Sequence, residues 1–260
     1  MNYPKDLEPL PDPFVNPSIE PIYATPISVD PTIRDSHGKI IWVTIGSWLI
    51  PFFLMVWVSL RLGDSMIKSG YSQDIAENFS FIIGGIVSTS YVIFRYNKIL
   101  GIDALYSSIK PNIMTFTIII PTAIIMVLDL VGSIGIGIIA DFLFPNQLEI
   151  PLSHNDKSLT DPIFLILVYI TLAIIAPISE EVLFRGLILD YLRKNYGDWP
   201  SIIISAILFG LVHFLPSYIA VATYGGLIYG WLRIKTGSLL PSILCHALWN
   251  SFVFVVLYLL

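Results

Sequence analysis

Residues 162–190 read PIFLILVYITLAIIAPISEEVLFRGLILD, and this stretch combines the two features that decide the fold of the chain. It is long and apolar enough to cross the hydrocarbon core of a membrane, for which about 20 residues are needed. Its second half nevertheless contains Glu180, Glu181 and Arg185, shortly after Pro177. Ionisable groups are unfavourable inside hydrocarbon, so each of these side chains needs a structural or chemical reason to be there.

The composition of the whole chain indicates a lipid environment. Of its 260 residues, 55% are hydrophobic and 13% are charged, and the mean hydropathy is +0.77. A soluble domain has about 25% charged residues, so lipid must replace water around much of this surface. The formal net charge is −5, and no basic run indicates a nucleic-acid partner.

Apolar stretches predict an all-α, polytopic transmembrane helix bundle of about seven spans, within a range of six to eight. The candidate spans are residues 40–60, 79–96, 113–140, 162–190, 200–216, 217–232 and 238–260. Residues 1–38 differ from the rest because they hold eight of the eighteen prolines. Proline at this density prevents regular helix and strand pairing, so we expect a disordered or extended tail.

Basic residues predict the orientation of the bundle. If the N-terminus is cytoplasmic and seven spans alternate, eleven Lys and Arg residues lie inside and three lie outside. By the positive-inside rule, this distribution favours a cytoplasmic N-terminus and a C-terminus on the opposite side. The inside set is Lys5, Arg34, Lys39, Arg95, Lys98, Lys110, Arg185, Arg193, Lys194, Arg233 and Lys235, and the outside set is Arg61, Lys68 and Lys157.

Three polar groups interrupt the last hundred residues. They are EEVLFRG at 180–186, FGLVH at 209–213 and HALWN at 246–250. With Asp190, Pro200 and Ser238 as cytoplasmic helix ends, Glu180, His213, His246 and Asn250 lie about 12 to 20 Å deep, at a rise of 1.5 Å per residue. We therefore expect these four side chains to converge on one polar cavity within the membrane.

Helix periodicity assigns different roles to the two adjacent glutamates. Glu181 and Arg185 are four residues apart, which favours an ion pair. Glu180 points about 100° away from Glu181, which leaves its carboxylate free to act as a general base. The alternative is a polar network that only holds helices together. We interpret Asp129, in the span 113–140, in that way, as an acid paired with a neighbouring helix.

The patterns EExxxR, FxxxH and HxxxN together resemble the CPBP family of intramembrane proteases, also called the CAAX-protease or Abi family. This family includes type II prenyl-protein endopeptidases and bacteriocin-immunity proteins. The resemblance covers about residues 160–260 and includes the turn KTGSLLP at 235–241. It implies a CAAX-protease-like catalytic core over residues 161–260, preceded by accessory transmembrane helices over 39–160.

The resemblance also implies a role for each motif residue. Glu180 matches the catalytic glutamate that activates water, and His213 matches the histidine that helps to position this water. His246 and Asn250 match the pair that binds the developing oxyanion or supports the glutamate. The supporting positions of the family pattern are Glu181 and Arg185.

The sequence leaves the metal question open between no cofactor and one divalent ion such as zinc. Glu180, His213 and His246 would be the ligands, because carboxylate and imidazole are common zinc ligands. The spacing differs from HExxH, and neutral imidazole together with an amide suits oxyanion donation, which favours the metal-free mechanism.

We interpret the chain as an intramembrane endopeptidase that hydrolyses a peptide bond of a membrane-associated protein or peptide. A non-catalytic immunity or scaffold protein of the same family is the alternative. A proton-coupled transporter would use similar buried residues, but the sequence shows no inverted repeat of the kind that transporters contain.

Overall fold

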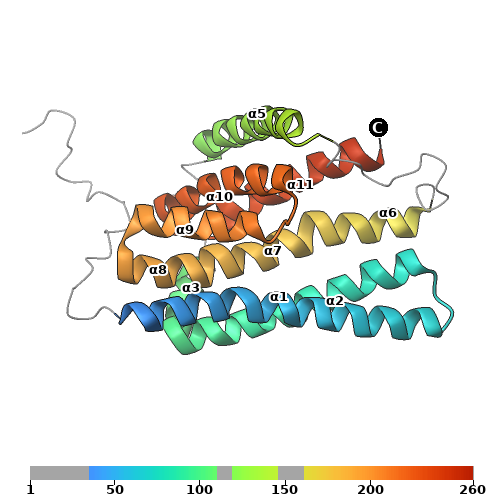
Figure 1. Cartoon of the computed structure of the whole chain (residues 1–260), viewed down its shortest axis with the longest axis horizontal. Coiled ribbons are helices and arrows are strands. Elements are labelled where there is room, and N and C mark those ends of the chain that lie inside the picture. Colours follow the sequence, from blue (N-terminus) through green and yellow to red (C-terminus); the bar gives the residue numbers. More distant parts are fainter. Residues whose placement is uncertain (1–34, 110–118, 146–160, 260) are drawn as a thin grey trace, which may run out of the picture.

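The computed structural model describes residues 35–109, 119–145 and 161–259, and the regular structure in these ranges is helical (Figure 1). Positions 1–34 of the predicted tail lie outside the described residues. The last two positions of the predicted tail, 37 and 38, already belong to the first helix, which begins at His37. The helices are α1 (His37–Lys68), α2 (Gln73–Leu100), α3 (Ile102–Ile109), α5 (Ile119–Leu143), α6 (Pro162–Tyr169), α7 (Ala176–Glu181), α8 (Leu189–Tyr196), α9 (Asp198–Leu211), α10 (Pro216–Thr236) and α11 (Leu240–Tyr258). Two π-helical segments, η2 (Ile170–Ile175) and η3 (Val182–Ile188), lie on either side of α7.

Among the described residues, five helices are long and apolar enough to cross a membrane, fewer than the seven spans that the sequence predicts. They are His37–Lys68, Gln73–Leu100, Ala123–Leu143, Pro162–Tyr196 and Leu240–Tyr258. The predicted spans 200–216 and 217–232 correspond to α9 and α10, which are not among them. The first part of the predicted span 113–140 lies outside the described residues.

The difference has two causes, because α9 is short, whereas α10, with 21 residues, is long enough but not apolar enough. Helix α9 has 14 residues, which at 1.5 Å per residue reach about 21 Å, less than the roughly 30 Å of a hydrocarbon core. The chain then reverses direction: Phe214 has a φ of 60°, and Leu215 is extended, as is usual for a residue before proline. Pro216 begins α10, which packs back along α9. A hydropathy window cannot distinguish this hairpin from two short spans.

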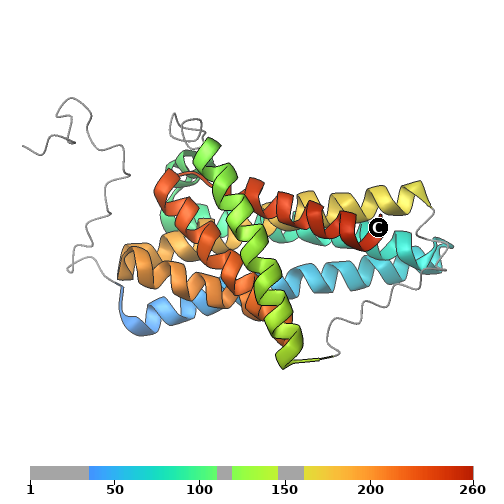
Figure 2. The same cartoon turned by 90° about the horizontal axis from the view of Figure 1, so that it is seen from above.

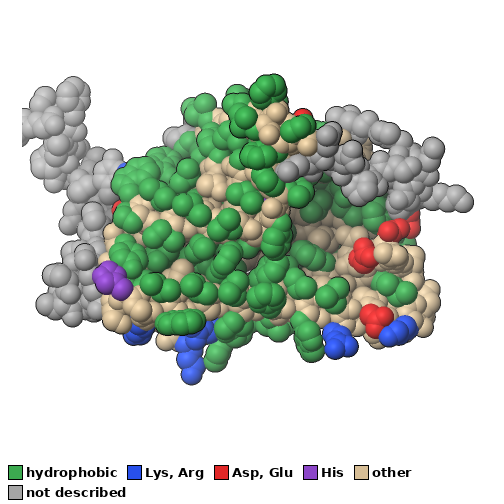
Figure 3. All heavy atoms as spheres, in the orientation of Figure 1, with side chains coloured by type: hydrophobic (Ala, Val, Ile, Leu, Met, Phe, Trp, Pro, Cys, Tyr) green, Lys and Arg blue, Asp and Glu red, His purple; other side chains and the backbone are tan. Residues whose placement is uncertain are grey.

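The surface of the bundle matches a lipid environment. Large apolar side chains such as Trp42, Phe53 and Leu60 on α1 and Phe142 on α5 are 62–84% exposed. Hydrophobic side chains also cover most of the face seen in Figure 3, and the charged ones lie mainly near its edges. These features indicate a multi-pass integral membrane protein.

The helices of the bundle run mostly along one long axis, with α5 crossing α10 and α11 obliquely (Figure 2). The first residues of α1 and the last residues of α11 lie at opposite ends of this axis (Figure 1). The side on which the N-terminus lies, and the division into tail, accessory helices and core, stay predictions from the sequence.

The longest helical run, residues 162–196, is continuous but contains two π-helical segments. Pro177 lies in the first turn of α7 and has no N–H group to donate, and η2 comes directly before it. Two carbonyls of the π-helical segments accept hydrogen bonds from other helices. The Asn250 side chain donates to the Leu172 carbonyl at 2.8 Å, and the Ser205 hydroxyl donates to the Phe184 carbonyl at 2.8 Å. π-helical turns are frequent at functional sites, and these contacts fix the segment that presents Glu180.

Candidate functional site

A cavity of about 690 Å³ lies between α2, α5, α7, α10 and α11. The structure brings Glu180, His213, His246 and Asn250 together in the lining of this cavity. The four residues come from three segments of the chain that are more than thirty residues apart, and they meet as the matched depths predicted. The volume is within the usual range of ligand-binding pockets, about 300–1,000 Å³.

The predicted ion pair between Glu181 and Arg185 is confirmed. Arg185 Nη1 lies 2.8 Å from Glu181 Oε1, and both side chains are fully buried. The guanidinium also lies over the ring of Phe209 at 4.3 Å and near the rings of Tyr229 and Phe184, which is a cation–π arrangement. An arginine without access to water needs such partners, because a buried unpaired charge is strongly unfavourable.

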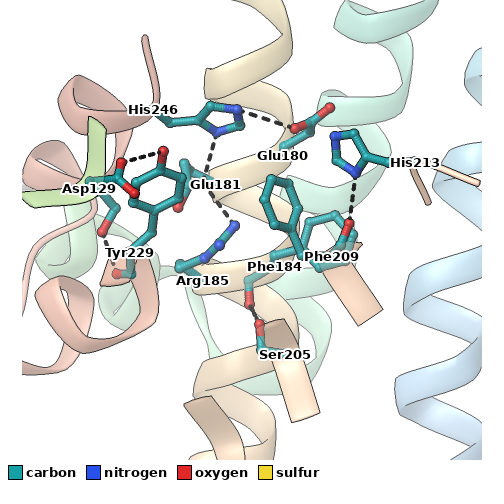
Figure 4. Close-up of polar contacts among 11 residues, drawn as sticks. Asp129, Glu180, Glu181, Phe184, Arg185, Ser205, Phe209, His213, Tyr229 and His246 are labelled. Atoms are coloured by element: carbon teal, nitrogen blue, oxygen red, sulfur yellow. Dashed lines mark hydrogen bonds and ion pairs between the residues drawn. The ribbon is translucent and has the colours of Figure 1, made fainter. Parts of the chain in front are cut away.

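His246 connects the two glutamates (Figure 4). Its Nδ1 lies 3.0 Å from Glu181 Oε1, and its Nε2 lies 3.7 Å from Glu180 Oε2. A carboxylate oxygen accepts hydrogen bonds, so the N–H group at Nδ1 donates a hydrogen bond to Glu181. This contact fixes the orientation of the ring and directs Nε2 toward Glu180 and the cavity. The sequence did not predict it, because positions 181 and 246 are remote in the chain.

Glu180 and Glu181 differ in their surroundings, as the helix geometry predicted. The side chain of Glu180 is 30% exposed and lines the cavity, whereas that of Glu181 is 0% exposed. Glu180 Oε2 is farther from His246 than a hydrogen bond allows, so the oxygen of a bound molecule can contact both groups. Of the two carboxylates, Glu180 is therefore the one available for chemistry.

His213 lies in the turn just after α9, two residues beyond Leu211, and lines the same cavity. Its Nδ1 donates to the carbonyl of Phe209 at 3.0 Å, since a carbonyl oxygen can only accept. This leaves Nε2 as the nitrogen available to the cavity, and Figure 4 shows the imidazole beside the Glu180 side chain. The ring of Phe209 lies edge-to-face with both His213 and His246, at centroid distances of 5.2 and 5.5 Å.

Asn250 lines the cavity and is tied to η2. One N–H of its amide is used by the carbonyl of Leu172, which leaves the second N–H and the amide oxygen for other partners. The HxxxN spacing therefore puts His246 and Asn250 on one face of α11, in contact with two different parts of the run that contains Glu180.

Tyr229 connects His246 to a third acid, Asp129. Tyr229 stacks on the imidazole at a centroid distance of 5.3 Å and an angle of 19°. Its hydroxyl donates to Asp129 Oδ2 at 3.0 Å, and Asp129 is 2% exposed. The interpretation of Asp129 as an acid paired with a neighbouring helix is thus confirmed. Tyr229 was missed by sequence reasoning, because a tyrosine in an apolar helix gives no signal of its partners.

The residues suggested as metal ligands do not form a metal-binding group in this structure. Within residues 35–109, 119–145 and 161–259, no three His, Cys, Asp or Glu side chains are placed to hold an ion together. The Nδ1 atoms of both His213 and His246 are already hydrogen-bonded within the protein.

The C-terminal part of the chain is similar to known proteins. Residues 162–252 match the Rce1-like family, type II CAAX prenyl endopeptidase Rce1-like, as the three motifs predicted. An uncharacterized 24.3 kDa protein of Escherichia coli is 33% identical over 130 residues, which cover 45% of this chain and 58% of that protein. YdiL of Bacillus subtilis (strain 168), a candidate membrane peptidase by its name, is 29% identical over 104 residues, 40% of this chain and 43% of that protein. No solved structure matches the chain.

Proposed function

We propose that this chain, whose residues 162–252 match the Rce1-like endopeptidase family, is an intramembrane endopeptidase with its active site in the 690 Å³ cavity. The matched segment contains all six motif residues of the predicted site. The substrate would be a membrane-associated protein or peptide. One observation carries the proposal: a partly exposed carboxylate, Glu180, faces an imidazole, His246, that a fully buried carboxylate holds in place.

In the proposed reaction, Glu180 takes a proton from a water molecule, and this water attacks the carbonyl carbon of the scissile peptide bond. His213 presents its Nε2 to the same space and helps to orient the water. The Glu180 carboxyl group then returns the proton to the leaving amine. General-base assistance of this kind accelerates reactions by roughly 10²- to 10⁴-fold.

The developing oxyanion needs hydrogen-bond donors. Asn250 has one amide N–H that the Leu172 carbonyl does not use, and His246 offers Nε2 when it is protonated. Glu181 Oε1 lies 3.0 Å from His246 Nδ1 and holds the ring so that Nε2 faces the cavity. Donors placed before the reaction begins can contribute several kcal/mol of transition-state stabilisation.

The test is cleavage of membrane-associated peptides by purified protein reconstituted in liposomes. We expect Glu180→Gln to lower turnover by roughly 10²- to 10⁴-fold without a change in melting temperature, because the amide keeps the shape but cannot accept the proton. Asp64→Asn is the matched control, since Asp64 is an exposed carboxylate at the far end of α1. Equal turnover by wild type and Glu180→Gln would refute the proposal. Binding without cleavage by both would favour the non-catalytic alternative.

A further inference from the structure

The cavity continues from the catalytic residues toward the end of the bundle where α1 and α2 join. Glu77 and Asn78, in the second turn of α2, belong to its lining. Thr89 on the same helix marks the level of the catalytic residues, because its hydroxyl lies 2.7 Å from that of Ser179, next to Glu180. Glu77 precedes Thr89 by twelve residues, which corresponds to about 18 Å along α2.

Glu77 gives this end of the cavity a negative charge. Its Oε1 accepts a hydrogen bond from Gln73 at 2.7 Å, and within the described ranges no Lys or Arg forms an ion pair with it. The described residues that line the cavity include no Lys or Arg, and Lys68 near the same end is paired with Asp64 at 2.6 Å. Figure 3 shows the hollow in this face of the molecule, with acidic side chains beside it.

A carboxylate in a hollow with apolar walls attracts cations more strongly than one on an open surface, because the walls concentrate its field. An extended peptide that reaches from Glu180 into this end of the cavity would pass Glu77. At about 3.3–3.6 Å per residue, 18 Å corresponds to about five residues.

We propose that Glu77 determines specificity by selecting a Lys or Arg side chain of the substrate, about five residues from the scissile bond. The inference rests on the proposed endopeptidase function and adds a substrate class to it: membrane-associated peptides with a basic residue at this distance. Lys and Arg suit the position because their long apolar stems can lie along the cavity wall while the charged group reaches the carboxylate.

Peptides with Lys, Gln or Glu at each position from three to seven residues on either side of the scissile bond provide the test. For the reconstituted wild type, we expect kcat/KM to be at least about fivefold higher for Lys than for Glu at one position near the fifth, given the strength of exposed ion pairs and the focused field. Glu77→Gln should abolish this preference and Glu77→Lys should invert it. Asp74→Asn is the control, because Asp74 is an acid in the preceding turn of the same helix that does not line the cavity.

The proposed role of Glu77 can fail without refuting the proposed endopeptidase function. Cleavage that requires Glu180 but shows the same charge preference in wild type and Glu77→Gln would overturn the role of Glu77 alone. An equal loss of preference in Asp74→Asn would overturn it too, because the effect would then come from general surface charge. Peptide binding to the Glu180→Gln variant tests the role of Glu77 without cleavage. The quantity measured is the ratio of the Kd values for the Lys and Glu peptides. We expect this ratio to be lost in the double variant with Glu77→Gln.

Discussion

Replacing Glu181 by glutamine removes the charge that faces Arg185 and keeps the shape of the side chain. Both members of the pair are 0% exposed, so the guanidinium of the variant is shielded from water. Among the described residues, no other carboxylate forms a hydrogen bond with it. Breaking a buried pair in this way destabilises proteins by about 3–5 kcal/mol. The cation–π contacts with Phe209 and Tyr229 remain and offset part of this loss.

The chain offers a matched control for this change. Asp64 and Lys68 form a second pair four residues apart, at 2.6 Å, with side chains that are 59% and 73% exposed. Exposed helical pairs of this kind contribute about 0.3–0.5 kcal/mol, so Asp64→Asn should leave stability almost unchanged. The comparison therefore isolates burial, because spacing, charge and the type of substitution are the same.

The measurement is thermal unfolding of both variants in detergent. For Glu181→Gln, we expect the melting temperature to fall by at least about 6 °C, using 2 °C per kcal/mol for a chain of this size. Glu181→Gln combined with Arg185→Met should recover part of this loss, because no unpaired charge is then buried. A Glu181→Gln variant as stable as Asp64→Asn would refute the reasoning and would mean that Arg185 reaches water by a movement that this structure does not show.

Two further predictions concern contacts that hold other helices together. Tyr229→Phe removes the shorter of two hydroxyl hydrogen bonds to the Asp129 carboxylate and leaves the one from Ser133 at 3.4 Å, so we expect a loss of about 1–3 kcal/mol in thermal unfolding; an unchanged melting temperature would contradict this. The hydrogen bond from Lys39, with a second one from Tyr191, holds the pKa of Asp35 below its ordinary value of 3.8. The start of α1 should therefore be stabilised above pH 3.8 and lose this contribution as the pH falls through the lower folded pKa, seen as faster hydrogen exchange there. The same pH response in Asp35→Asn would disprove that origin.

Local features of the candidate site followed from the sequence because they depend on positions within one helix. The four-residue spacing of Glu181 and Arg185 is enough to predict their ion pair, and the angle between neighbouring helix positions separates Glu180 from Glu181. The depths of His213 and His246 could be calculated from the sequence and matched that of Glu180, because a membrane helix is nearly straight and has a known rise per residue. The membrane environment itself followed from composition.

The number of spans could not be predicted in the same way. Hydropathy measures how apolar a stretch is, and residues 200–216 are apolar whether they cross a membrane or turn back within it. The reversal depends on the backbone at Phe214 and Leu215 and on the packing of α10 against α9. A proline at 216 indicates a break, but it does not say how deep in the membrane the break lies.

The sequence by itself determined that this is an α-helical membrane protein and which polar residues gather in its C-terminal half, because lipid solubility and helix periodicity are properties of short segments. Only the tertiary structure decided which atoms of these residues meet. The hydrogen bond from His246 to Glu181, the stacking of Tyr229 on His246 and the place of Glu77 in the cavity wall join positions remote in the chain. Such contacts depend on how whole helices pack and rotate against one another, and no local pattern of residues encodes that rotation.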